Sequence, residues 1–134
     1  MLEITIRRAG ANDIESIALL AAKIFDDSRI SELDVYYVAE VKRKDAEEIV
    51  GFVHLIEKPE KIVLQGIGVD EKFRNAGIGT KLLDAALAYC EQSSAAEVVL
   101  KVRALNPAAN LYLSHGFFAK QMGDVLTLVR KKPN

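Results

Sequence analysis

Residues 61–92 restrict the possible folds of this chain more than any other stretch, because they join an apolar run to a helical pattern through glycines. The run KIVLQGIGV (61–69) is almost wholly apolar, which is typical of a strand covered on both faces. Helical spacing then extends over GIGTKLLDAALAYCEQ (77–92). The apolar face of this predicted helix consists of Leu82, Leu83, Ala86, Leu87 and Cys90. A strand, a glycine loop and a long helix in this order predict an α/β fold.

Hydrophobic periodicity elsewhere predicts the remaining elements of a mixed-sheet α/β domain. Apolar spacing from Ile14 predicts a first helix, with Asn12 and Glu15 as its capping box, and the polar segment 26–33 is expected to form a loop or a short helical turn. Pro107 and Gly116 bound a short helix. Besides 61–69, strands are expected at 2–8, 34–43, 48–58, 96–104, 117–121 and 124–132. The predicted order is β-α-β-β-β-α-β-α-β-β in a single domain over 1–134.

Composition argues against several classes of function. A length of 134 residues fits one domain, and a formal net charge of −1 gives no general attraction for nucleic acid or an anionic membrane. One cysteine and two histidines form neither an internal disulfide nor a good zinc set, so we expect no metal. The N-terminus lacks the apolar core of a signal peptide, and no apolar run reaches transmembrane length. We therefore expect a cytoplasmic location.

Gly77 and Gly79 predict an anion site, because the first amides of a helix lack partners and carry the positive end of its dipole. Glycine lets such amides approach phosphate oxygens closely. A Walker A loop is excluded because Thr80 and then Lys81 follow Gly79. A dinucleotide fingerprint is excluded because its third glycine is replaced by Leu82. The anion must belong to another class of ligand.

Three segments resemble the GNAT superfamily of acetyl-CoA-dependent N-acetyltransferases. VDEKFRNAGIGTKLL (69–83) is similar to the family's pyrophosphate loop, with its Arg-x-x-Gly-x-Gly pattern. NPAANLYLSHGF (106–117) loosely resembles the family's segment ending in Tyr-x-x-x-Gly-Phe, and TIRRAGANDIESIALL (5–20) resembles its first strand and helix. The resemblance covers nearly the whole chain. It implies a mixed, mainly antiparallel central sheet with helices on both faces.

The resemblance implies acetyl-CoA as cosubstrate. Loop residues would cradle its pyrophosphate, and the strand residues Ile67 and Val69 would bond the pantetheine arm as an added strand does. Asn106 would bond the same arm, cap the helix begun by Pro107, or do both. The implied cofactor-binding residues are Ile67, Val69, Arg74, Asn75, Ala76, Gly77, Gly79, Thr80, Asn106 and Tyr112.

The family's reaction is the direct attack of an amine on the thioester, which requires a free amine, an oxyanion donor and an acid for the sulfur. The resemblance implies that the Val69 amide is the donor and Tyr112 the acid, with core packing as the alternative for Tyr112. Gln65 stands where many members carry glutamate, and an amide cannot take a proton. The candidate bases are a water held by Gln65, the His54 imidazole and the Glu57 carboxylate. We favour a structural role for His54.

The predicted function is transfer of an acetyl group to a primary amine through a tetrahedral intermediate, and a catalytically silent acyl-CoA-binding module is the alternative. Freeing an α-amine at pH 7 costs about 1 kcal/mol, against about 4.6 kcal/mol for a lysine amine. A site without a strong base therefore favours a peptide or protein N-terminus, or a small amine of low pKa. Asp26, Asp27 and Glu32 are candidates for attracting a cationic amine, and a homodimer paired through LTLVR (126–130) stays open.

Overall fold

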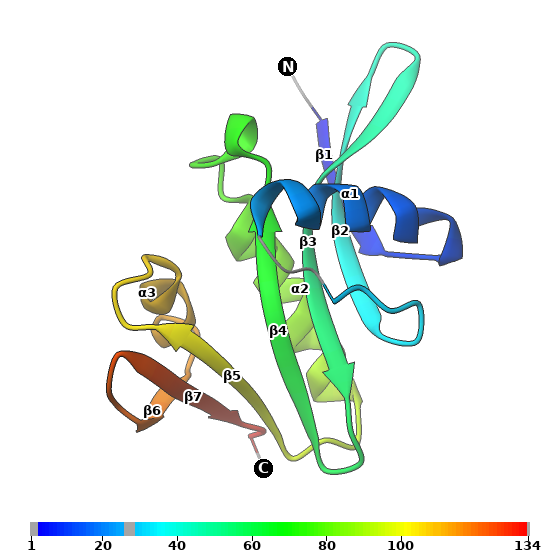
Figure 1. Ribbon diagram of the computed structural model, residues 1–134. Helices are drawn as coiled ribbons and strands as arrows, with labels where there is room; N and C mark the ends of the chain where they lie inside the picture. The colour runs from blue at the N-terminus through cyan, green and yellow to red at the C-terminus, as the bar shows by residue number, and fades with distance from the viewer. Residues whose placement is uncertain (1–2, 26–28, 134) are drawn as a thin grey trace.

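The computed structural model describes residues 3–25 and 29–133, which form a twisted seven-stranded sheet with helices on both faces (Figure 1). The strand order is β1-β2-β3-β4-β5-β7-β6, and of these neighbouring pairs only β4 and β5 run parallel. The predicted mixed, mainly antiparallel sheet is confirmed. The strands are β1 (Glu3–Arg8), β2 (Val35–Arg43), β3 (Ala46–Glu57), β4 (Lys61–Val69), β5 (Glu97–Arg103), β6 (Phe118–Gln121) and β7 (Val125–Lys131).

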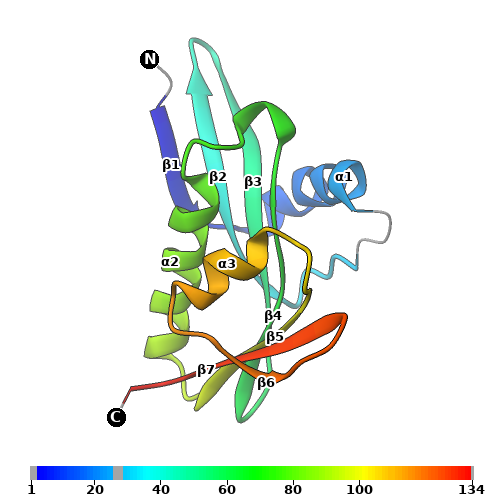
Figure 2. The same cartoon turned by 90° about the vertical axis from the view of Figure 1, so that its left-hand side faces the viewer.

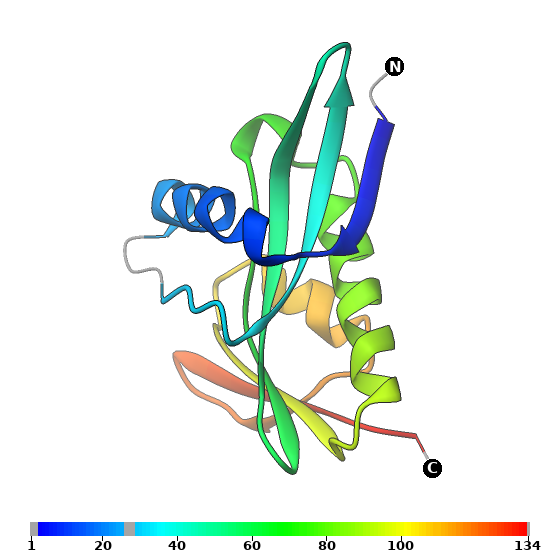
Figure 3. The same ribbon diagram turned by 90° about the vertical axis from the view of Figure 1, so that its right-hand side faces the viewer.

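Helix α1 (Ile14–Ile24) covers one face of the sheet, and α2 (Ile78–Gln92) and α3 (Ala108–Leu113) cover the other (Figures 2 and 3). Each long helix buries the stripe that its 3.6-residue spacing predicts. The α1 stripe packs on the side chains of β2 and β3, whereas the α2 stripe packs on the larger core beneath β1 to β5. Cys90 belongs to that larger core, where burial raises the pKa of its thiol to about 11.

Two irregularities in the middle of the sheet shape the space around β4. The β3–β4 register shifts between His54 and Leu55, which leaves Gln65 unpaired as a β-bulge between Leu64 and Gly66. Bulges re-aim side chains and bend the strand. In addition, β4 pairs with β5 over residues 61–63 alone, so the later part of β4 runs without a neighbour on that side. The two strands diverge toward the glycine loop (Figure 1).

The start of α1 differs from the predicted capping box of Asn12 and Glu15. A short 3-10 turn, η1 (Ala11–Asp13), comes first, and Asp13 Oδ2 accepts a hydrogen bond from the Gly10 amide at 2.8 Å. Asn12 is exposed. The extra turn moves the helix start to Ile14, and the Asp13 carboxylate caps the 3-10 turn and not α1.

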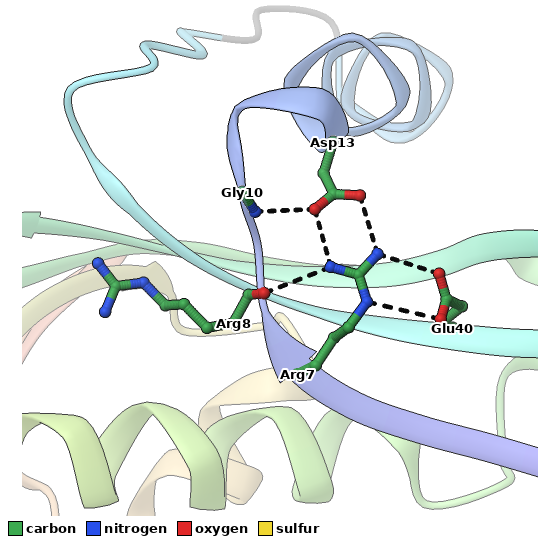
Figure 4. Close-up of polar contacts among 5 residues, drawn as sticks. All are labelled: Arg7, Arg8, Gly10, Asp13 and Glu40. Atoms are coloured by element: carbon green, nitrogen blue, oxygen red, sulfur yellow. Dashed lines mark hydrogen bonds and ion pairs between the residues drawn. The ribbon is translucent and has the colours of Figure 1, made fainter.

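Arg7 ties this helix start to two strands (Figure 4). Its guanidinium contacts Asp13 Oδ2 at 2.8 Å and Glu40 Oε2 of β2 at 3.0 Å. The hydrogen bonds from Arg7 lower the pKa of the Asp13 carboxyl, while the pKa of Arg7 itself is raised. One guanidinium thus joins β1, β2 and η1 through two carboxylates.

The position of strand β7 contradicts the suggestion that LTLVR (126–130) pairs across a dimer axis. It lies between β5 and β6, so both of its edges already carry partners. The predicted roles of Asp26 and Asp27 lie outside the described residues, and Glu32 is exposed in a turn. No helix within 3–25 and 29–133 is long and apolar enough to cross a membrane.

Candidate active site

Asp70 fixes the loop that links β4 to α2. Its side chain is buried, accepts a hydrogen bond from the Lys72 amide at 3.0 Å and contacts Lys23 Nζ of α1 at 3.2 Å. These bonds, that of the Lys72 amide first, lower the pKa of the Asp70 carboxyl. A further 3-10 turn, η2 (Glu71–Phe73), follows it directly. The loop therefore starts from a rigid and ionised anchor.

The main-chain amides of residues 75–80 point out of this loop without partners. Asn75 and Gly77 have positive φ values of 66° and 77°, and the first helical bond of α2 runs from the Lys81 amide to the Gly77 carbonyl at 3.1 Å. Within the described chain, none of the preceding amides from Asn75 to Thr80 donates a hydrogen bond. Successive free NH groups in such a turn form a concave anion site.

The two glycines Gly77 and Gly79 differ in why a side chain is absent at their positions. The backbone at position 77 is left-handed, which favours glycine there. A Cβ on Gly79 would meet only Leu111 Cδ2, at 3.8 Å. Ordinary packing therefore leaves room for a larger residue at position 79. The space above Gly79 is open for a ligand.

A groove of about 540 Å³ extends from this loop along β4 and past the start of α3. It brings together most of the residues that the resemblance implies for the cofactor. Ala76 and Tyr112 are not among its lining, and Ile24, Phe25 and Leu111 are lining residues that sequence reasoning missed. Of the predicted set, the groove is lined by Ile67, Val69, Arg74, Asn75, Gly77, Gly79, Thr80 and Asn106.

Two predicted residues have local structural roles in addition. Asn106 Oδ1 accepts a hydrogen bond from the Ala108 amide at 2.9 Å, so it caps α3 as one of its two expected roles requires. Arg74 Nε donates to the Val69 carbonyl at 3.2 Å, which holds the loop against the end of β4. Their contacts with a cofactor remain predictions.

Tyr112 is buried in α3, with its ring edge-on to Phe117 at 5.7 Å between centroids. Burial raises the pKa of its phenol to about 12, and the hydroxyl makes no hydrogen bond to any residue that the structure describes. The side chain thus packs in the core, as the alternative reading holds. Its role as the acid stays a prediction, and the raised pKa makes proton release harder than for an ordinary tyrosine.

A smaller cavity of about 100 Å³ opens on the α1 face of the sheet. Phe25 lines both this cavity and the groove, and the bulged Gln65 lines the cavity. The cavity is mainly apolar and carries no carboxylate in its described lining. It is lined by Ala21, Phe25, Arg29, Ile30, Phe52, His54, Gln65 and Gly66.

The structure places two of the three candidate bases at the small cavity. Gln65 and His54 both line the small cavity. Glu57 lines neither space and accepts a hydrogen bond from the Tyr89 hydroxyl at 2.7 Å, so the hypothesis that it is the base has no geometric support. The described residues contain no group of three or more side chains suited to a metal ion.

Comparison with known proteins identifies the family of this chain. Residues 8–117 match the model of the Acetyltransferase (GNAT) family, and the chain belongs to that family. It is 40% identical over 92 residues to an N-alpha-acetyltransferase from Sulfurisphaera tokodaii. That match covers 61% of this chain and 55% of the relative, so the chain spans about half the length of the curated protein.

Two solved structures show how closely the fold agrees. The ribosomal-protein-S18-alanine N-acetyltransferase from Escherichia coli superposes with a TM-score of 0.80 at 18% identity, over 98% of this chain and 96% of that one. Arabidopsis thaliana NAA60, solved in complex with a bisubstrate analogue, gives 0.81 at 22% identity, over 98% and 100%. At these identities the likeness establishes the fold.

Proposed function

We propose that this protein transfers the acetyl group of acetyl-CoA to a primary amine by direct attack of the amine on the thioester. The observation that carries the proposal is the row of free amides from Asn75 to Thr80 at one end of a groove beside the unpaired part of β4. This arrangement offers an anion site for a diphosphate and a strand edge for an extended amide-containing arm. Membership of the GNAT family supports the same assignment.

The groove suggests how the cosubstrate lies. Its diphosphate binds at the start of α2, and its pantetheine arm runs along Ile67 and Val69 toward the β4 bulge. The thioester then lies near Phe25, which lines both the groove and the small cavity. An amine that enters from the α1 face reaches the carbonyl carbon there.

The acceptor that we propose is the α-amine of a peptide or protein N-terminus. The small cavity has no carboxylate in its described lining, and an α-amine needs far less help to lose its proton than a lysine does. The apolar walls of the cavity suit the first side chain of such a peptide. The curated relative carries the name N-alpha-acetyltransferase, which agrees with this choice. A cytoplasmic location, consistent with the single buried Cys90, belongs to the same proposal.

Calorimetry and thiol release together test the proposal. Acetyl-CoA is first titrated into the protein, and release of free CoA is then followed with two peptides of one sequence. One peptide has a free α-amine and arginine in place of lysine; the other is blocked at its N-terminus and keeps its lysine. We expect binding, and thiol release with the first peptide. Preference for the lysine peptide would contradict the acceptor, and binding without any thiol release would identify a silent acyl-CoA-binding module.

A further inference from the structure

The small cavity needs a proton acceptor if an ammonium group is to react there, and Gln65 cannot serve. A primary amine at neutral pH is largely protonated and must lose a proton before or during attack. Glu57 lies elsewhere, and the charged side chain that shares the described cavity lining with His54 is the cation Arg29. His54 is therefore the group of this lining with a suitable lone pair.

The partner of His54 fixes which ring nitrogen carries the proton. Nε2 of this buried imidazole lies 2.8 Å from Asp34 Oδ2, and the Asp34 side chain is 19% exposed. An ionised carboxylate only accepts hydrogen bonds, so in the neutral ring Nε2 holds the hydrogen and Nδ1 has the free lone pair. Asp34 then holds the imidazole in one tautomer.

The other ring nitrogen, Nδ1, is not sealed from solvent. Nδ1 makes no hydrogen bond to the residues that the structure describes, yet no polar side-chain atom among them is both sealed from solvent and unpartnered. Nδ1 therefore touches solvent, and the space that His54 lines is the small cavity. His54 also pairs with Gly66, the residue next to the bulged Gln65, which places it across from the part of β4 that we assign to the thioester.

Tyr36 limits the motion of the ring. Its phenol ring stacks on the imidazole at 4.4 Å with an interplanar angle of 28°, and its hydroxyl accepts a hydrogen bond from the Ser31 amide at 3.0 Å. The ring is thus held on one face by stacking and at Nε2 by a carboxylate. These two contacts fix the orientation of the ring more closely than burial of a histidine by itself requires.

We infer that His54 is the general base of this site and that Asp34 is its positioning residue. The inference rests on the proposed acetyl transfer. Nδ1 takes one proton from the ammonium group, directly or through a water, and the amine lone pair forms the C–N bond while the C–S bond later breaks. The second amine proton ends on the departing thiolate, and His54 returns its proton to solvent. Asp34 stabilises the imidazolium formed in between.

The sharpest test is His54→Gln, because the glutamine amide can still donate to Asp34 but offers no base at the Nδ1 position. Thiol release is measured from pH 6.5 to pH 9.5 with a set of hexapeptides that differ in their first residue. We expect a loss of about 100-fold in kcat at pH 7, within the usual range for removal of a general base, and little change in acetyl-CoA affinity. Asp34→Asn should show a smaller loss.

The pH profile separates a base from a merely structural residue. As the pH rises above the ordinary α-amine pKa of about 7.8, the substrate is already deprotonated, so the deficit of His54→Gln should shrink by about tenfold. Asp34, which directly precedes β2, contacts the His54 ring at Nε2, and Arg29 lines the same cavity as His54. A deficit that is the same at every pH would overturn the inference, and so would an undiminished rate at pH 7.

The outcomes also separate this inference from the proposed function. A wild-type protein that releases no thiol with any peptide of the set would remove both proposals. An active wild type with an equally active His54→Gln variant removes the base alone. Urea unfolding of each variant shows whether the fold is kept, and a loss of rate that follows the loss of stability would assign His54 a structural role.

Discussion

Replacing Gly79 with aspartate should weaken acetyl-CoA binding without harming the fold. The new negative charge repels the diphosphate, whereas it interacts favourably with the start of helix α2 in the free protein. A Cβ at position 79 has ordinary clearance, with Leu111 Cδ2 at 3.8 Å. An acidic side chain in the first turn of α2 interacts favourably with the helix dipole, by about 0.3–1 kcal/mol. The Gly79→Asp protein should therefore be as stable as the wild type or slightly more stable.

The same charge acts against the ligand. Two unit charges about 4 Å apart interact by about 1 kcal/mol in water and about 4 kcal/mol in a partly shielded site. The groove is open to solvent, so we expect an intermediate penalty of about 2 kcal/mol, which raises Kd about 30-fold. The carboxylate also competes for the free amides between Asn75 and Thr80.

Gly79→Asn is the matched control, since it has nearly the same shape and no charge. Calorimetry with acetyl-CoA and urea unfolding should be run on the wild type and both variants. We expect the asparagine variant to bind with a modest loss and the aspartate variant to bind far more weakly. If the two variants bind equally, charge does not decide the affinity and the diphosphate does not lie at this loop.

Three further results are expected. Gly68→Ala should lower the free energy of unfolding by about 1–3 kcal/mol, because its Cβ would lie 2.9 Å from an aromatic carbon on β3. In the control Gly66→Ala on the same strand, the nearest atom to the new Cβ is 3.9 Å away, so its stability should be close to that of the wild type. Equal urea midpoints for the two variants would contradict this. Arg7→Met should cost about 1 kcal/mol at pH 7. Because Arg7 lowers the pKa of Asp13, the stabilisation from this ion pair is present above the ordinary carboxyl pKa of about 3.9 and disappears as the pH falls through the lowered pKa. A difference in unfolding free energy between wild type and variant that does not narrow from pH 7 to pH 3 would refute this. Tyr112→Phe should reduce kcat at least tenfold by the loss of the acid and weaken acetyl-CoA binding much less. An unchanged kcat would leave Tyr112 without the acid role.

Local patterns were sufficient for most elements. The apolar run 61–69 is β4 to the residue, and the helix expected over 77–92 begins one residue later, at Ile78. The β2–β3 hairpin is tighter than predicted, because Arg43 pairs with Ala46 and only Lys44 and Asp45 form the turn. Such differences arise where cross-strand pairing, rather than the period of the side chains, decides where a strand starts.

The sequence by itself determined the row of free amides before Lys81, because residues 75–80 are consecutive and their geometry depends on the local glycines and on the start of α2. The small cavity was decided by tertiary structure alone. Asp34, His54 and Gln65 come from three segments, and a register shift of one residue between β3 and β4 places the last two at the same cavity. The burial of Tyr112 and the internal position of β7 are also long-range results. Periodicity specifies which face of an element is apolar, but pairing between distant strands sets which side chains meet.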